Sequence, residues 1–372
     1  MYIVFRTDAS LQIGTGHVMR CLTLADALQE AGAQCHFICR EHPGNLIELI
    51  RQRGFLVIVL PLTVESVVTP DQRVETQPNY AAWLGTDWNT DSEQAKVGVG
   101  DTAADWLIVD HYALDIRWEQ MLRPVCRHMM VIDDLANRAH DCDLLLDQNL
   151  GRDVCDYGQF VPKSCTVLVG PQYALLRPEF AALREESLRR RATPQFKHLL
   201  ITMGGVDQAD ATGKVLEALQ ECKLPVDFYI TVVMGRHAPW LARVQTLAKR
   251  LPQPVVVKVN ISNMAQVMAA SDLAIGAAGS TSWERCCLGL PSMIGVLADN
   301  QIFIADALQQ AGAAKTFVVN EEMTTLRALL AELADDPGEI ARMSTCAANV
   351  TDGVGAKRIS ATLVNRSLAL QA

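Results

Sequence analysis

A strand, a glycine loop and a helix follow one another at the start of the chain, and this unit constrains the fold more than any other feature. Ile3–Phe5 is a short apolar strand, and a polar loop that ends in Gly14–His17 comes after it. Apolar residues then recur at helical spacing from Val18 to Leu28, and Gly32 stands where a helix ends. A strand that leads through a glycine loop into a helix is typical of a parallel sheet with crossover helices.

The same alternation continues along the chain and predicts the α/β class, with two Rossmann-like doubly wound domains facing across a cleft. The run 185–196 is charged and contains a proline, which indicates a linker before a second series of strands that starts at His198. We therefore expect a first domain at 1–190, a second at 191–356 and a tail helix at 357–372. The polar stretch 61–104 is an excursion with one helix near Asp91–Val97.

Composition excludes several classes of function. The 372 residues are 49% hydrophobic and 20% charged, enough for two packed cores, and the net charge of −9 argues against general nucleic-acid binding. Eleven scattered cysteines lack zinc-site spacing, so we predict no metal and no cofactor. Without a signal peptide or a run of about 18 apolar residues, the pattern predicts a cytoplasmic protein that does not enter a membrane.

The first glycine loop is a candidate reaction site. Gly14 and Gly16 allow a ligand to approach the backbone, and His17 lies at the helix start, where backbone N–H groups lack intrahelical partners. Histidine is the side chain best suited to take a proton near neutral pH, so we predict that His17 activates a nucleophile. The alternative is a histidine that only caps the helix or lies on the surface.

Three further loops follow strands of the second half. Gly204 and Gly205 lie between a strand and a helix, and the run 276–284 is another glycine loop that enters a helix. The third loop, 298–301, lies between the end of a strand and the start of a helix. Backbone N–H groups and hydroxyls of such a loop can receive a diphosphate, and a carboxylate one turn later can accept both hydroxyls of a ribose. Tight turns without a ligand are the alternative. The candidate residues are Gly204, Gly205, Gly279, Ser280, Thr281, Glu284, Asn300 and Gln301.

Several longer motifs resemble one family. GTGHVMRCLTLADAL, LIVDHYALD, DDLANRAHDCDLLLDQNL, GPQYALLRPEF, ITMGGVDQADAT and GSTSWERCCLGLPS together resemble the nucleotide-sugar hydrolases of pseudaminic acid biosynthesis. These are UDP-2,4-diacetamido-2,4,6-trideoxy-β-L-altropyranose hydrolases, similar in fold to the glycosyltransferase that completes the peptidoglycan lipid precursor. The resemblance covers about residues 1 to 320, and it implies the glycosyltransferase B-type fold.

The resemblance also implies roles for single residues. His17 matches the family's general base, and Glu284 matches its nucleotide-binding carboxylate. Arg177 and Tyr112 match a substrate-binding arginine and a cleft tyrosine, and Asn300-Gln301 matches a pair near the sugar. A surface salt bridge for Arg177 and a buried strand-end aromatic for Tyr112 are the alternatives. No site residue is assigned within 61–104.

The expected reaction is the metal-independent hydrolysis of this UDP-sugar, with inversion at the anomeric carbon. His17 would activate the water, and either Asp8 or Asp110 would orient its ring. The implied ligand is the UDP-linked diacetamido-trideoxy sugar, and we expect a monomer. Two rivals stay open: a glycosyltransferase of the same fold and a non-catalytic nucleotide-sugar binding protein.

Overall fold

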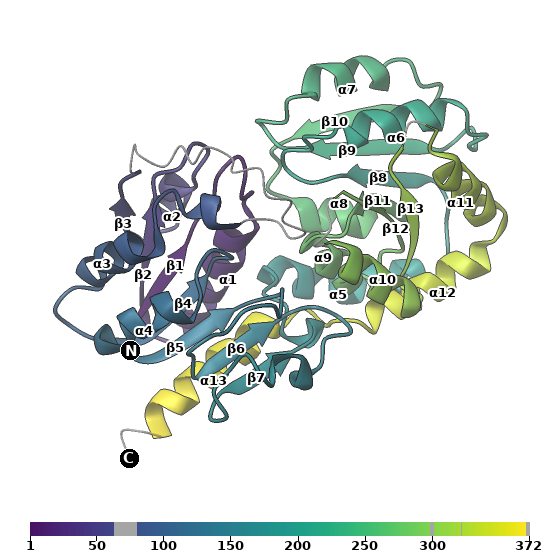
Figure 1. The fold of residues 1–372 in the computed structure, drawn as a ribbon. Coiled ribbons are helices and arrows are strands. Elements are labelled where there is room, and N and C mark those ends of the chain that lie inside the picture. The colour runs from purple at the N-terminus through teal and green to yellow at the C-terminus, as the bar shows by residue number, and fades with distance from the viewer. Residues whose placement is uncertain (63–79, 298–300, 321, 370–372) are drawn as a thin grey trace. The chain divides into compact units, whose positions relative to one another are not determined.

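The computed structural model describes residues 1–62, 80–297, 301–320 and 322–369 (Figure 1). The chain divides into two compact units. Unit 1 comprises Met1–Leu175 together with Ala356–Ala372, and unit 2 comprises Leu176–Gly355.

Unit 1 contains, within its described residues, a parallel seven-stranded sheet in the order β3-β2-β1-β4-β5-β6-β7. Helices lie on both faces, because alternate residues of each strand point to opposite sides. Ile3 and Phe5 of β1 join the core cluster that includes α1 and α13, and Val4 joins the cluster that includes α3 and α4.

The strands are β1 (Tyr2–Thr7), β2 (Gln34–Arg40), β3 (Leu56–Leu60), β4 (Ala104–Asp110), β5 (Cys126–Ile132), β6 (Leu144–Asp147) and β7 (Thr166–Val169). The α-helices are α1 (Gly16–Glu30), α2 (Ile47–Gln52), α3 (Trp88–Val99), α4 (Ile116–Leu122) and α13 (Gly355–Ala369), and the short 3₁₀ helices are η1 (Tyr80–Leu84), η2 (Arg123–Val125), η3 (Val154–Tyr157) and η4 (Pro171–Tyr173).

Unit 2 repeats this plan with different residues. Its described part holds a parallel six-stranded sheet in the order β10-β9-β8-β11-β12-β13. In both units the strand order reverses direction beside the first strand, as in doubly wound folds. The strands are β8 (His198–Thr202), β9 (Tyr229–Met234), β10 (Val255–Val259), β11 (Leu273–Ala277), β12 (Ser292–Val296) and β13 (Ala314–Val318). The helices are α5 (Pro178–Arg191), α6 (Ala211–Gln220), α7 (Leu241–Ala248), α8 (Met264–Ala270), α9 (Thr281–Cys287), α10 (Ile302–Gln310), α11 (Thr324–Asp335) and α12 (Pro337–Ala348).

The α/β class and the doubly wound sheets are confirmed, and the helix predicted near Asp91–Val97 is present as α3. The interpretation of 185–196 as a linker is wrong for most of its length, because α5 extends to Arg191. The units divide at Leu175 and Leu176, whereas the sequence predicted a boundary after residue 190. The edge strand β13 was not predicted, because its short run is interrupted by the charged Lys315.

The tail helix α13 belongs to unit 1 and does not form a separate part. Ile359 and Leu363 are buried in the core beside α1. The indole of Trp106 on β4 donates a hydrogen bond to Ser367 Oγ at 2.9 Å, and Arg366 donates to the carbonyl of Asp143 at 3.1 Å. In Figure 1 this yellow helix runs alongside β6 and β7. Unit 1 is therefore completed by residues that follow Leu175, the end of its first segment, by more than 180 positions.

Candidate functional site

The glycine loop of unit 1 starts at the point where its strand order reverses. Thr7 and Asp110 are register partners at the carboxyl ends of β1 and β4. The chain leaves β1, turns at Ser10, whose hydroxyl accepts the N–H groups of Gln12 and Ile13, and enters α1 at Gly16. Gly14 has φ of 81°, a left-handed conformation that favours glycine. This path places His17 in the first turn of α1, at the edge where such sheets bind ligands.

His17 is held by Asp110, the last residue of β4. Nδ1 of His17 lies 2.6 Å from Oδ1 of Asp110, and both side chains are buried. Burial by itself raises the pKa of Asp110, but the charge of Arg20 and the hydrogen bonds from Arg20 and His17 hold that pKa well below its usual range. The ionised carboxylate can only accept, so Nδ1 of His17 carries the hydrogen and Nε2 is left to take a proton.

Asp8, the other carboxylate considered from the sequence, has different partners. Its Oδ1 lies 2.7 Å from Nη1 of Arg6 and accepts the backbone N–H of Arg40 at 2.6 Å. The structure thus places Asp110, and not Asp8, against the histidine.

Arg20 is a part of this arrangement that the sequence reasoning missed. Its Nε and Nη2 donate to the two oxygens of Asp110, each at 2.6 Å, and its Nη1 donates to Asp134 at 2.9 Å. A bidentate guanidinium–carboxylate contact of this kind fixes the position of the carboxylate and stabilises its ionised form. The signal available in the sequence was the spacing of three between His17 and Arg20, which places both on one helix face.

An aromatic cluster contacts His17 through one of its members, Tyr112. The ring of Tyr112 packs edge-on against the imidazole, with 4.7 Å between ring centroids. Trp83 stacks on Tyr112 at 5.7 Å, and Tyr80 packs edge-on against Tyr112 at 4.9 Å. The stretch 61–104, to which the sequence assigned no site residue, therefore contributes two rings, although 63–79 lies outside the described residues.

In unit 2 the predicted glycine loops also follow the two strands at the reversal point, β8 and β11. Gly204 and Gly205 come two and three residues after β8, and a Cβ on either would meet open space. The run from Gly276 ends β11 and enters α9, with Gly279 half-buried and Ser280 exposed. Both loops offer backbone at the edge where such sheets bind ligands.

Glu284 and Arg177 lie together although they are far apart in sequence. Nη2 of Arg177 is 3.7 Å from Oε1 of Glu284, and its Nη1 is 2.9 Å from Glu179. Arg177 immediately precedes α5, so this helix brings it to α9. Burial raises the pKa of Glu284 to about 7, against the opposing charge of Arg177. A carboxylate with such a pKa gains or loses its charge near neutral pH.

The predicted pair at the start of α10 is only partly described. Asn300 lies outside the described residues. The side-chain oxygen of Gln301 accepts the backbone N–H of Leu297 at 3.1 Å, so it holds the chain that leaves β12.

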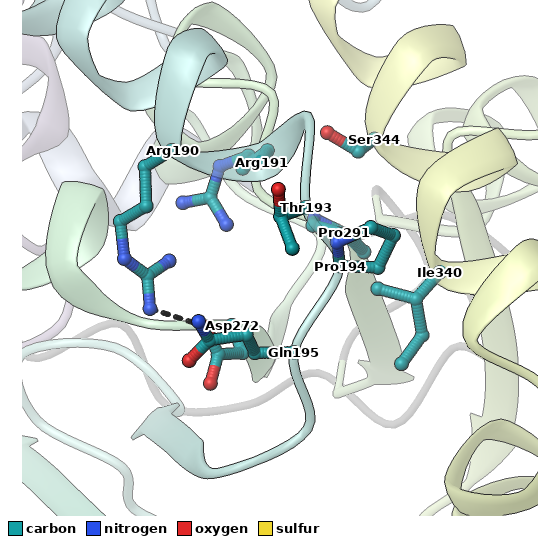
Figure 2. A pocket seen from close by; sticks show the side chains of 9 residues that line it. All are labelled: Arg190, Arg191, Thr193, Pro194, Gln195, Asp272, Pro291, Ile340 and Ser344. Carbon is teal, nitrogen blue, oxygen red and sulfur yellow. Dashed lines mark hydrogen bonds and ion pairs between the residues drawn. The ribbon is translucent and has the colours of Figure 1, made fainter.

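A hollow at the opposite edge of this sheet is shown in Figure 2. Asp272 and Pro291 directly precede β11 and β12, and Gln195 precedes β8, so the hollow lies at the amino ends of these strands. Arg190 is paired there with Asp272. Because doubly wound sheets bind ligands at the carboxyl ends of their strands, this hollow is not the candidate substrate site.

Within the described residues, no group of three or more His, Cys, Asp or Glu side chains is arranged to hold a metal ion. No helix in the described part of the chain is long and apolar enough to cross a membrane.

Comparison with known proteins agrees with the fold. Residues 198–359 match the glycosyltransferase family 28 C-terminal domain. An uncharacterized protein of Methanocaldococcus jannaschii is 26% identical over 306 residues, which are 81% of this chain and 56% of that relative, so the chain spans little more than half of its length. The UDP-2,4-diacetamido-2,4,6-trideoxy-β-L-altropyranose hydrolase of Campylobacter jejuni is 26% identical over 288 residues, covering 77% of this chain and 89% of the hydrolase.

Solved structures match almost the whole chain. The MurG protein of Acinetobacter baumannii superimposes with a TM-score of 0.68 and 16% identity, covering 98% of this chain and 99% of MurG. The UDP-GlcNAc 2-epimerase of Neisseria meningitidis, solved with UDP-GlcNAc, gives a TM-score of 0.60 and 13% identity, with 98% and 99% covered. The chain therefore has the glycosyltransferase B-type fold, its residues 198–359 match a glycosyltransferase domain family, and it is similar in sequence to the Campylobacter UDP-sugar hydrolase.

Proposed function

We propose that the protein hydrolyses UDP-2,4-diacetamido-2,4,6-trideoxy-β-L-altropyranose to UDP and 2,4-diacetamido-2,4,6-trideoxy-L-altrose. The observation that carries the proposal is the buried His17–Asp110 pair, with 2.6 Å between Nδ1 and Oδ1, at the carboxyl edge of the sheet in unit 1. A histidine oriented in this way is a general base for water. The sugar is taken from the name of the Campylobacter relative, which is 26% identical.

The proposed reaction is a single displacement at the anomeric carbon. Nε2 of His17 takes a proton from water as the water oxygen bonds to that carbon. The bond from the carbon to the phosphate oxygen breaks, and its electron pair leaves with UDP. Attack from the face opposite the leaving group inverts the configuration. UDP is a good leaving group once its charge is stabilised, so no separate general acid is required.

The remaining residues are proposed to bind the substrate. Gly14 and Gly16 allow the sugar to approach the backbone, and Tyr112 contacts it beside His17. The glycine loops of unit 2 receive the diphosphate. Glu284 accepts the ribose hydroxyls, and Arg177 balances the charge of this carboxylate. The loop residues are Gly204, Gly205, Gly279, Ser280 and Thr281, and Asn300 and Gln301 are assigned to the sugar.

The proposal is tested by incubating the pure protein with the UDP-sugar in H₂¹⁸O and following UDP release by NMR. We expect label at C1 of the sugar, inverted configuration in the first product, and full activity in EDTA. Label in the phosphate of UDP would show attack at phosphorus and exclude the anomeric mechanism. His17→Ala should lower kcat by about 10²- to 10⁴-fold while UDP still binds. Unchanged turnover in this variant would remove His17 as the base.

A second candidate function is transfer of the sugar to an acceptor other than water. It is favoured by the match of residues 198–359 to a glycosyltransferase domain family. The rate of UDP release separates the two. A hydrolase turns over fully in buffer, whereas a transferase stays slow until an acceptor alcohol is added. A protein that binds the UDP-sugar without releasing UDP under either condition would be a binding protein.

A further inference from the structure

Arg285, on α9, lies directly behind the second glycine loop of unit 2, the run 276–284. Its side chain is buried, with 1% of the residue exposed. Nη2 donates to the carbonyl of Ala277 and to Oγ of Ser282, both at 2.9 Å, and Nη1 donates to Oγ1 of Thr281 at 3.4 Å. A Cβ on Gly276 would lie 2.4 Å from Nη1. Only glycine therefore leaves room for the guanidinium behind the loop.

The neighbouring Glu284 acts on the positive charge of Arg285 without forming an ion pair with it. Within the described residues, no ion pair joins Arg285 to a carboxylate, and its Nε has no hydrogen-bond partner. Burial lowers its pKa to about 10, which still leaves the group charged at neutral pH. A buried charge without a direct ion pair is costly to maintain, because buried charges are normally paired and hydrogen-bonded.

Arg191 shows how a buried arginine of the same unit is satisfied without a ligand. It is also buried, and its pKa is lowered by burial to about 9. Its donors reach the carbonyls of Met268, Ser271 and Leu288, at the carboxyl ends of α8 and α9. Helix carboxyl ends carry partial negative charge, which suits a cation. Arg285 instead faces one carbonyl and two hydroxyls that belong to the loop itself.

We propose that Arg285 is a positioning residue that supplies the buried positive charge for the diphosphate of the bound nucleotide. An arginine N–H can only donate, so the hydroxyls of Thr281 and Ser282 accept from it. Their own hydrogens then point away from Arg285. The hydroxyl of Thr281, which is half-buried, can donate to a phosphate oxygen of a ligand on the loop. The positive charge of Arg285 thus stabilises the bound diphosphate indirectly, by orienting the hydroxyl groups of the loop toward it. This inference rests on the proposed nucleotide site of unit 2.

The test compares ligands that differ only in phosphate charge. Binding of UDP, UMP and uridine is measured by calorimetry for the wild type, Arg285→Met and Arg285→Gln. We expect UDP affinity to fall about 10- to 100-fold in both variants, UMP affinity to fall less, and uridine affinity to change by less than about threefold. Equal losses for UDP and uridine would overturn the proposal, because they would show a purely structural role. Arg285→Gln keeps a donor for the carbonyl of Ala277, so it serves if Arg285→Met does not fold.

Arg191→Met is the matched control, since it removes a second buried guanidinium from the same unit. We expect it to lower the Tm and to leave the ratio of UDP to uridine affinity within about twofold of wild type. A loss of that ratio in the control would also count against a specific role for Arg285. The proposed hydrolysis can fail separately: wild-type protein that binds UDP but releases no sugar contradicts the reaction and leaves this inference standing. Wild-type protein that binds UDP no more tightly than uridine contradicts the inference itself.

Discussion

At the scale of single residues, two of the side chains that donate to Asp110 depend on the ionised form of its carboxylate. It accepts from Nδ1 of His17 and from two nitrogens of Arg20, all at 2.6 Å. Arg20 keeps this carboxylate charged, and the charged carboxylate keeps the hydrogen of His17 on Nδ1. The imidazole is therefore prepared to accept a proton on its other nitrogen.

Asp110→Asn tests this dependence. An amide can donate to Nδ1 and stabilise the tautomer whose hydrogen is on Nε2, which cannot act as the base. We expect kcat for UDP release to fall about 10²- to 10⁴-fold, and UDP affinity to stay within about twofold. Steady-state kinetics and calorimetry measure the two quantities, and thermal unfolding verifies that the variant is folded. An unchanged kcat would show that Asp110 does not orient the base.

Glu284 predicts a pH dependence of nucleoside binding. Its pKa is raised to about 7, so the carboxylate that would accept the ribose hydroxyls forms as the pH rises through 7. We expect uridine affinity to increase from pH 5.5 to 8 and then to level off. Uridine is the proper ligand because its lack of phosphate removes the titration of UDP itself. Glu284→Gln should bind weakly with a flat profile, and a rising profile in that variant would assign the titration to another group.

At the scale of elements, α5 organises unit 2 through its cationic side chains. Arg184 donates to the carbonyls of Cys287, Ala348 and Thr351, at 2.5, 2.7 and 3.0 Å. These carbonyls lie at or beyond the carboxyl ends of α9 and α12, where a positive charge is favourable. Arg184 directly precedes the run 185–196, and Arg191 within that run donates in the same way to carbonyls at the carboxyl ends of α8 and α9. The helical part of the predicted linker therefore also carries a charge that joins other helices.

Arg184→Ala should lower the free energy of unfolding of unit 2 by about 2–4 kcal/mol, because it leaves several carbonyls without a charged donor. Arg189→Ala is the control on the same helix. Arg189 pairs with Glu185 on the exposed surface, and its loss should cost less than about 0.5 kcal/mol. Urea unfolding followed by circular dichroism measures both. Equal effects of the two substitutions would contradict the role given to Arg184.

At the scale of the whole molecule, unit 1 is built from both ends of the chain. Leu363 of α13 is fully buried in the core that also contains β1 and α1, while Leu368 of the same helix is 58% exposed. Leu363→Ala should cost about 2–5 kcal/mol of stability, and Leu368→Ala less than about 0.5 kcal/mol. Thermal unfolding of the full chain compares the two variants. Similar Tm values for both would show that α13 is not needed for the core of unit 1.

The sequence by itself determined the class of fold, the positions of most strands and helices, and the loops to consider. Periods of 2 and 3.6 residues and the glycine loops after strands are local properties, so they can be read without tertiary contacts. The family resemblance, carried by short motifs such as GTGH and GSTSWE, is supported by the comparisons. The roles assigned to His17, Glu284 and the loop residues stay predictions.

Only the tertiary structure decided which side chains meet. His17 and Asp110 are 93 positions apart, and they meet because β1 and β4 are neighbours in the sheet. The roles of α5 and α13 likewise depend on contacts with distant elements, so their charge and periodicity could not reveal them. The environment of Arg285 could be predicted least well, because an arginine next to a glutamate in the sequence suggests an ordinary surface ion pair. The burial of Arg285 behind Gly276 is a property of the folded chain alone.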